Sequence, residues 1–335
     1  MAEGMTWSIE EADKLTQAEI YGDVLCQLGD KYPDLVAITA DLAKSTKIGR
    51  FGEKFPDRFF NVGIAENTMF GMAAGMAQAG LRPVVSTFAV FTALRSAEQV
   101  RTDICYQNLD VKIIATHAGI SFGQAGSTHH CTEDIAITRS FANMTVIVPA
   151  DGIETGNAVA AAMEWPGPVY IRIGRGFEPN VHTTKDYGFE IGKAETINDG
   201  NDITIICCGV TVLHAVRAAK VLEKEGLSVR VINMHTIKPI DKDVILKAVE
   251  ETKRIVTVEE HNVFGGLGSA VGEVIVESGK ACVFKELGLP DVYSIVGYPE
   301  DLYNYYKIDS DGIVETISEM MGKKIEEDKD WEDET

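Results

Sequence analysis

The chain has 335 residues, of which 45% are hydrophobic and 24% charged, and its formal net charge is −20. This length predicts about two domains, and the negative charge argues against a nucleic-acid partner. No apolar run reaches the roughly 20 residues of a membrane-spanning helix, and the acidic N-terminus lacks the apolar core of a secretory signal. The six cysteines form no CxxC pair, which is typical of reduced thiols, so we expect a cytoplasmic protein without a membrane contact.

Apolar, strand-like runs alternate with helical patterns along the first half of the chain. The strands are expected at residues 35–39, 57–64, 83–86, 111–116, 145–148 and 169–173. The helices are expected at residues 9–31, from Glu66 onward, and at 88–106 and 153–163, with a loop rich in glycine, serine and histidine at 119–132. This alternation predicts a doubly wound α/β domain, a parallel sheet covered by helices on both faces.

A second α/β set follows a stretch rich in proline and glycine, residues 178–202, which we interpret as a linker with a short hairpin. Its strands are expected at residues 203–208, 229–233, 255–259 and 292–296, and its helices at 211–226, 241–251, 268–278 and 311–321. We therefore place one domain at residues 8–178, a linker at 179–191 and a second domain at 192–322. The acidic tail at 323–335 is predicted to be disordered.

Residues 61–80, NVGIAENTMFGMAAGMAQAG, contain an unusual predicted helix. Its single acidic residue, Glu66, lies at the helix start, where a carboxylate ordinarily complements the helix dipole. Gly71 and Gly75 each cost a helix about 1 kcal/mol relative to alanine. A helix tolerates this cost where another backbone comes very close, so the pattern predicts a closely packed interface with a lone carboxylate at its mouth.

Polar and aromatic side chains follow the predicted strands of the first domain at the ends where parallel sheets bind ligands. They are Asp41, Glu66, Phe88, His117, and the pair Arg172 and Arg175. Five such coincidences in one domain favour a site at this edge.

Each of these residues also has an ordinary structural explanation. Asp41 is a candidate helix N-cap, and Phe88 and Phe91 are candidates for the core. His117 could be a histidine with satisfied hydrogen bonds at a strand end, and Arg175 a salt-bridge partner in the linker.

The chain resembles the pyrimidine-binding domain of transketolases in DRFFNVGIAENTMFGMAAGMAQAG, RPVVSTFAVFTALRSAEQVRTDI, ATHAGISFGQAGSTHHCTEDIA and VIVPADG. It resembles the transketolase C-terminal domain in ITIICCGVTVLHAVRAAKVLEKEG, VRVINMHTIKPID and VTVEEHNVFGGLGSAVGE. The related thiamine-diphosphate enzymes include 1-deoxyxylulose-5-phosphate synthase and the β subunits of oxoacid dehydrogenases.

The resemblance implies that the Glu66 carboxylate is catalytic. It would hydrogen-bond N1′ of the aminopyrimidine of thiamine diphosphate, and so promote removal of the proton from C2 of the thiazolium. Phe88 matches the aromatic residue that stacks on the pyrimidine, and Phe91 matches its neighbour in that wall. Asp41 and Leu42 match a pair near the thiazolium. Such chemistry needs a carboxyl group desolvated at an interface, with its proton affinity raised by burial.

The same resemblance places His117 and His129 at the histidines of the substrate channel, where they would act in catalysis and substrate binding. Ser45 and Arg175 match positions that bind the distal phosphate of sugar substrates. A hydroxyl, a histidine and an arginine fork suit a phosphate or a related oxyanion.

Three positions depart from the family pattern. Ala125 replaces an acidic residue of the histidine loop, which puts the usual preference for hydroxyl stereochemistry in doubt. Leu94 replaces an aromatic residue of the pyrimidine wall. The arginine expected in the first helix, another phosphate ligand, falls near Thr16, which weakens the case for an ordinary sugar phosphate as acceptor.

The chain contains no GDG sequence, although transketolases bind the diphosphate of the cofactor through Mg²⁺ on a GDG…N motif. Adjacent side chains point in different directions, so His129, His130 and Cys131 are not expected to form a metal site. We therefore expect no metal ligands in this chain. The resemblance implies that an N-terminal partner subunit carrying the GDG…N motif holds Mg²⁺ (or Ca²⁺) in an α2β2 assembly.

These inferences predict the C-terminal, catalytic subunit of a split transketolase. With its partner it would transfer a two-carbon ketol unit from a ketose phosphate, or a related anionic sugar, to an aldose. A β subunit of an oxoacid dehydrogenase is the alternative enzyme, and the histidine loop and STFAVF favour the transketolase. A non-catalytic regulatory homologue is the alternative from another class.

Overall fold

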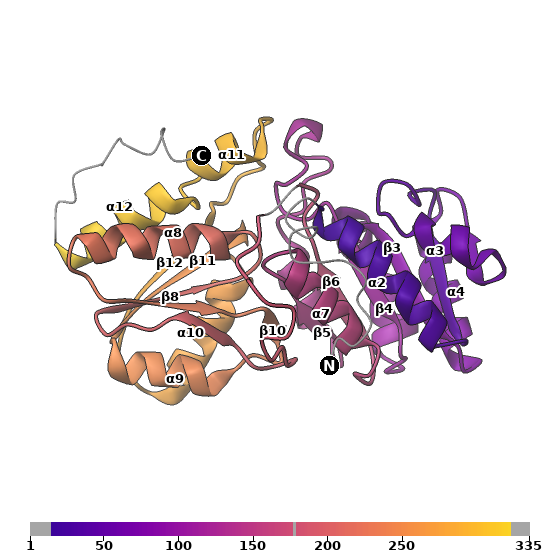
Figure 1. Ribbon diagram of the computed structural model, residues 1–335, viewed down its shortest axis with the longest axis horizontal. Helices are drawn as coiled ribbons and strands as arrows, with labels where there is room; N and C mark the ends of the chain where they lie inside the picture. Colours follow the sequence, from indigo (N-terminus) through magenta and orange to yellow (C-terminus); the bar gives the residue numbers. More distant parts are fainter. Residues whose placement is uncertain (1–14, 177–178, 323–335) are drawn as a thin grey trace.

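The computed structural model describes residues 15–176 and 179–322. Figure 1 shows two α/β domains side by side, joined by the linker and by a short strand. The two predicted doubly wound domains are confirmed. The expected first turns of the N-terminal helix, residues 9–14, and the acidic tail lie outside the described residues.

The first domain is built on a seven-stranded sheet in the order β10-β5-β6-β4-β3-β1-β2. Every neighbouring pair is parallel except β10 with β5. The strands are β1 (Leu35–Thr39), β2 (Phe59–Asn61), β3 (Arg82–Phe88), β4 (Lys112–Thr116), β5 (Thr145–Ile147), β6 (Val169–Arg172) and β10 (Thr236–Lys238). The central strands are buried along their whole length, as expected for apolar runs covered on both faces.

Helices cover both faces of this sheet. One core lies under α2 (Gln17–Lys31), α3 (Gly49–Lys54) and α7 (Gly152–Ala162). The other lies under α4 (Glu66–Gln78), α6 (Asp134–Ser140) and the helical segment η2 (Phe91–Arg95), α5 (Ala97–Gln99) and η3 (Val100–Cys105). Two 3₁₀ turns, η1 (Pro56–Arg58) and η4 (Gly123–Ala125), lie in the loops.

The helix predicted at 88–106 differs in two respects from the structure. Phe88 is the last residue of β3, and η2 and η3 are wound as π-helices. A π turn inserts an extra residue per turn and is frequent at functional sites.

The second domain has a five-stranded sheet in the order β12-β11-β8-β9-β7. Its strands are β7 (Glu195–Asn198), β8 (Ile203–Cys207), β9 (Val229–Asn233), β11 (Arg254–Asn262) and β12 (Val283–Leu289). Its helices are α8 (Thr211–Lys224), α9 (Lys242–Glu251), α10 (Leu267–Ser278), α11 (Pro299–Tyr305) and α12 (Ser310–Met321). In Figure 1, α8 and α12 cover one face of the sheet, and α9 and α10 cover the other.

Two predicted elements are wrong. Residues 292–296 form no strand, because this apolar run lies largely exposed on the surface and β12 takes the sheet edge instead. The expected hairpin within 178–202 does not form either, since β7 pairs antiparallel with β9. The sequence did not predict β12, because the adjacent charged residues Lys285 and Glu286 interrupt the apolar run of VFKELGL.

The domains are held together by β10 and by two buried ion clusters. Although β10 follows β9 of the second domain, it pairs with β5 of the first sheet. In the first cluster, Arg172 donates to Asp134 at 2.9 Å and to the backbone oxygen of Glu260 at 2.7 Å. The domain limits at residues 178 and 192 stay predictions.

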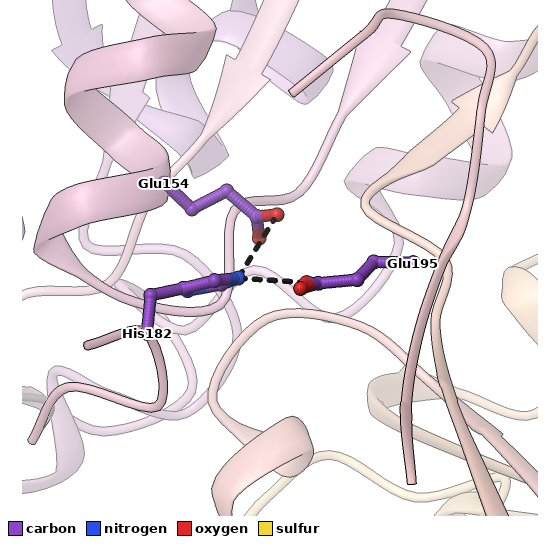
Figure 2. Close-up of side chains that lie close together, drawn as sticks. All are labelled: Glu154, His182 and Glu195. Carbon is purple, nitrogen blue, oxygen red and sulfur yellow. Dashed lines mark hydrogen bonds and ion pairs between the residues drawn. The ribbon is translucent and has the colours of Figure 1, made fainter. Parts of the chain in front are cut away.

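The second cluster contains residues from both domains and the linker, and Figure 2 shows three of them, Glu154, His182 and Glu195. His182 of the linker lies 2.7 Å from Asp151 at Nδ1 and 2.8 Å from Glu195 at Nε2. Glu154 lies 3.9 Å from the same Nε2. Burial alone favours the neutral ring, but the hydrogen bonds to Asp151 and Glu195 raise the pKa of His182 to about 10. The imidazolium therefore joins the two domains through ion pairs.

Candidate active site

The ends of five parallel strands place the candidate residues along one edge of the first sheet. In sheet order, Arg175 follows β6, His117 follows β4, Phe88 ends β3, Asp41 follows β1 and Glu66 follows β2. Asp41 and His117 have φ angles of 61° and 59°, a conformation in which non-glycine residues are uncommon. Strain of this kind clusters at functional sites.

Glu66 begins α4, and its side chain is only 3% exposed. Its Oε1 accepts a hydrogen bond of 2.8 Å from Nη1 of Arg95, the last residue of η2. The guanidinium carbon of Arg95 lies 4.1 Å from the centre of the Phe91 ring. Glu66 is therefore a buried carboxylate joined through an arginine to the aromatic wall.

The aromatic wall is continuous. Phe88 stacks on His117 at 3.9 Å between ring centres, and Phe91 lies 5.6 Å from Phe88. Phe122 packs edge-on against Phe88, against His117 at 4.8 Å and against His129 at 5.7 Å. Both predicted aromatic residues and both predicted histidines thus meet in one cluster, with Phe122 at its centre.

The two histidines differ in their surroundings. His117 is 5% exposed, and its Nδ1 lies 2.9 Å from the hydroxyl of Thr116. Burial, together with the nearby Arg175 and His129, lowers the pKa of His117 to about 3. His117 is therefore neutral at pH 7, and its ring can donate one hydrogen bond and accept another without carrying a charge. His129 is partly exposed, and its Nδ1 lies 3.0 Å from the hydroxyl of Thr128.

The second domain holds the histidine loop in place. Glu260 of β11 accepts hydrogen bonds from the backbone N–H of Ile120 at 2.9 Å and from the Tyr303 hydroxyl at 3.2 Å. Burial raises the pKa of Glu260 to about 7. A Cβ atom at Gly119, whose φ is 59°, would lie 2.3 Å from the Glu260 carboxyl carbon, so only glycine fits there. The loop that carries His129 is thus positioned by a side chain from the other domain.

The β1–α3 loop carries the remaining predicted contacts. Asp41 and Ser45 are exposed, and the Asp41 N–H donates to Asn61 Oδ1 at 3.0 Å. Leu42 packs against the core that includes Phe88. The explanation of Asp41 as a helix N-cap is wrong, because the next helix, α3, has Ile48 at that position.

The two arginines at the end of β6 have different surroundings. Arg172 is buried in the domain interface, where it pairs with Asp134 and Glu260. Arg175 is exposed, and its guanidinium carbon lies 4.8 Å from the centre of the Phe122 ring. Arg175 therefore lies at the aromatic cluster, and Arg172 is a structural residue.

The three departures also have defined places. Thr16 is the N-cap of α2, where it forms a capping box with Glu19. Leu94 is 50% exposed on η2. Ala125 ends the 3₁₀ turn of the histidine loop.

The one group of three potential metal ligands found among residues 15–176 and 179–322 is Glu154, His182 and Glu195. The oxygen atoms of Glu154, which a metal ion would need, already accept hydrogen bonds from protein groups. The Glu154 oxygens accept four hydrogen bonds, from Ala150, Tyr187 and twice from the Asn233 amide. A carboxylate offers about four acceptor sites, so we interpret this group as an interdomain ion cluster.

Sequence reasoning missed Arg95, Phe122 and Glu260. Phe122 had a signal, since it lies inside the histidine loop. Arg95 follows Phe91 by four residues, but the π winding that aims it at Glu66 could not be foreseen. Glu260 had no local signal, because its contact crosses the domain boundary.

Comparisons with known proteins agree with this architecture. The pyrimidine-binding domain of transketolase matches residues 13–178, and the transketolase C-terminal domain matches residues 192–313. A protein of Methanocaldococcus jannaschii described as a transketolase C-terminal section is 42% identical over 305 residues, which are 91% of this chain and 96% of that protein. One of the subunits of the apulose-4-phosphate transketolase of Phocaeicola vulgatus is 39% identical over 90% of this chain and 96% of its own length.

A solved structure of a split gene transketolase, an inactive β4 tetramer, superposes with a TM-score of 0.84 at 41% identity. The match covers 93% of this chain and 99% of that chain. Fold and matches together define a two-domain chain of a thiamine-diphosphate-dependent class. The chain belongs to the transketolase family and corresponds to the C-terminal section of a split transketolase.

Proposed function

We propose that this chain is the catalytic subunit of a split transketolase, which transfers a two-carbon ketol unit from an anionic ketose to an aldose. The observation that carries the proposal is Glu66, a buried carboxylate beside the wall of Phe91 and Phe88 at the ligand-binding edge of the sheet. An aminopyrimidine offers ring nitrogens to a carboxylate and a flat face to an aromatic ring. The donor set therefore fits the pyrimidine half of thiamine diphosphate.

When bound, thiamine diphosphate supplies the carbon centre that carries the ketol unit. Glu66 would hold a proton at N1′ of the pyrimidine, and Phe88 and Phe91 would fix the plane of that ring. His117, neutral because of its lowered pKa, and His129 would bind and exchange protons with the sugar oxygens. Asp41 and Leu42 would border the thiazolium.

The other half of the cofactor needs a second chain. A diphosphate with Mg²⁺ requires oxygen ligands in octahedral geometry, and the sequence lacks the GDG motif that supplies them in the family. We propose that an N-terminal subunit carries GDG…N and its metal, in an α2β2 heterotetramer. The exposed Ile64, which is 79% accessible, and the open face of α4 beside Glu66 support a partner surface there.

The substrate is proposed as an anionic sugar. Arg175 lies on Phe122 within the cluster, and Ser45 lies exposed on the loop after β1. Phosphate and sulfonate oxyanions both suit an arginine fork, and a relative is named for apulose 4-phosphate. The negative charge and the six free cysteines support the cytoplasm as the place of action.

Reconstitution tests the proposal. The chain and an N-terminal transketolase subunit are purified separately and mixed with thiamine diphosphate, Mg²⁺, a panel of phosphorylated and sulfonated ketoses, and aldoses. We expect two-carbon transfer from the pair and none from either chain alone. Nanomolar binding of thiamine diphosphate by the isolated chain would contradict the split site. An assembled pair that binds the cofactor but transfers no ketol unit from any donor would favour the regulatory homologue.

A further inference from the structure

Arg95 binds one oxygen of the carboxylate that the proposed chemistry requires. Its Nη1 donates to Glu66 Oε1 at 2.8 Å, and its guanidinium stacks on Phe91 at 4.1 Å. The Glu66 side chain is 3% exposed, whereas the Arg95 side chain is 47% exposed. One member of this ion pair is therefore fixed in the protein, and the other reaches it from the solvent side.

This contact gives the buried Glu66 carboxylate a charged partner in the cofactor-free chain. An ionised carboxylate without a partner is strongly destabilising when buried. Arg95 supplies the opposite charge through its contact with Oε1 of Glu66.

The same contact opposes the proposed function of Glu66. A pyrimidine nitrogen would bind a carboxylate oxygen of Glu66, and a guanidinium nitrogen already donates to one of these oxygens, Oε1. The two partners therefore compete for Oε1 of Glu66.

The local structure allows Arg95 to leave without disturbing its neighbours. The Ser96 hydroxyl donates to Asn67 Oδ1 at 2.9 Å, which ties the end of η2 to α4 one residue beyond the ion pair. The half-exposed arginine can turn into solvent or remain on the Phe91 ring while this bond keeps the backbone in place.

We propose that Arg95 is a positioning residue that holds Glu66 in the cofactor-free chain and is displaced when the aminopyrimidine binds. The inference rests on the proposed function, because it takes thiamine diphosphate as the entering ligand. It makes Arg95 a competitor of the cofactor, which sets how tightly the assembled enzyme binds thiamine diphosphate.

The first test measures cofactor affinity by titration calorimetry on the assembled pair. Arg95→Met should tighten thiamine diphosphate binding about fivefold, the scale of one partly exposed ion pair. Arg95→Lys, which keeps the charge, should return affinity toward the wild-type value. Arg101→Met, which removes an exposed arginine of η3, should leave affinity unchanged. Equal or weaker binding by Arg95→Met would overturn the inference.

The second test uses the isolated chain and needs no cofactor. Arg95→Met should lower the melting temperature, because Glu66 loses its charged partner, and adding Glu66→Gln to that variant should recover most of the loss. An unchanged melting temperature for Arg95→Met would refute the holding role. If the wild-type pair binds no thiamine diphosphate, the proposed function fails, and the proposed displacement of Arg95 fails with it. The melting temperatures of the single and double variants still decide whether Arg95 holds Glu66.

Discussion

At the scale of single residues, the site depends on how burial changes the chemistry of ordinary side chains. Glu66 and His117 are both nearly inaccessible, yet the first has a cationic partner and the second is held neutral. Phe122 joins the two histidines in one cluster. We propose that the carboxylate serves the cofactor and the neutral imidazole serves the substrate, as two separate groups along one wall.

Replacing Glu66 tests the residue-scale assignment. In the assembled pair, Glu66→Gln should reduce ketol transfer by about 10²- to 10⁴-fold, the usual contribution of a general acid–base group. Assembly should survive, because the amide has the same shape. Steady-state kinetics and gel filtration measure the two effects. Glu98→Gln, an exposed carboxylate on α5, is the matched control, and near-normal activity of Glu66→Gln would remove Glu66 from the mechanism.

At the scale of elements, α4 has the composition of a contact helix, but its two glycines have almost no neighbours within the described chain. A Cβ atom at Gly75 would meet nothing within 4 Å among residues 15–176 and 179–322, and one at Gly71 would meet only Asp103, at 3.8 Å. The close approach predicted from these glycines is therefore absent inside the described part of the subunit. The face is open, and the prediction of an interface now concerns a separate chain.

The variant Gly75→Leu distinguishes an effect on folding of the isolated chain from an effect on assembly with the partner. Gly75→Leu should leave the isolated chain folded, and somewhat more stable, because glycine costs a helix about 1 kcal/mol. The same side chain should block a close-packed partner and weaken assembly by at least tenfold. Thermal unfolding and analytical ultracentrifugation measure these effects. Lys220→Leu adds an exposed leucine to α8 instead; if both variants assemble like the wild type, α4 is not the interface.

At the scale of the whole molecule, the second domain acts as a support for the first. Glu260 holds the histidine loop, the Ser127 hydroxyl donates to the backbone oxygen of Ser294, and β10 extends the first sheet. His182 links both domains through Asp151 and Glu195. The geometry of the site thus depends on the domain interface, although the candidate residues lie in the first domain.

The charge of His182 predicts how stability depends on pH. Its pKa is about 10 in the folded chain against about 6.5 when unfolded. A raised pKa stabilises the fold fully below the unfolded value, and the contribution is lost as pH rises through about 10. At pH 6, His182→Gln should lower the melting temperature by about 5–10 °C, and the difference should shrink toward pH 10.

Tyr187→Phe is the control for this experiment. It removes the hydroxyl that donates to Glu154 at 2.6 Å but keeps the imidazolium, so its effect should be nearly constant between pH 6 and pH 10. A pH-independent loss in His182→Gln would show that the ring acts by packing alone.

The sequence by itself determined the two α/β domains, most of their strands, and the position of Asp41, Glu66, Phe88, His117 and Arg175 at one edge of the first sheet. These features follow from local hydrophobic runs, and from the rule that parallel strands end on one side of their sheet. Only the tertiary structure decided what each residue contacts. The Glu66–Arg95 pair, the hold of Glu260 on the histidine loop and the transfer of β10 to the first sheet join segments distant in sequence. Such contacts depend on how elements pack, and no local pattern of residues encodes them.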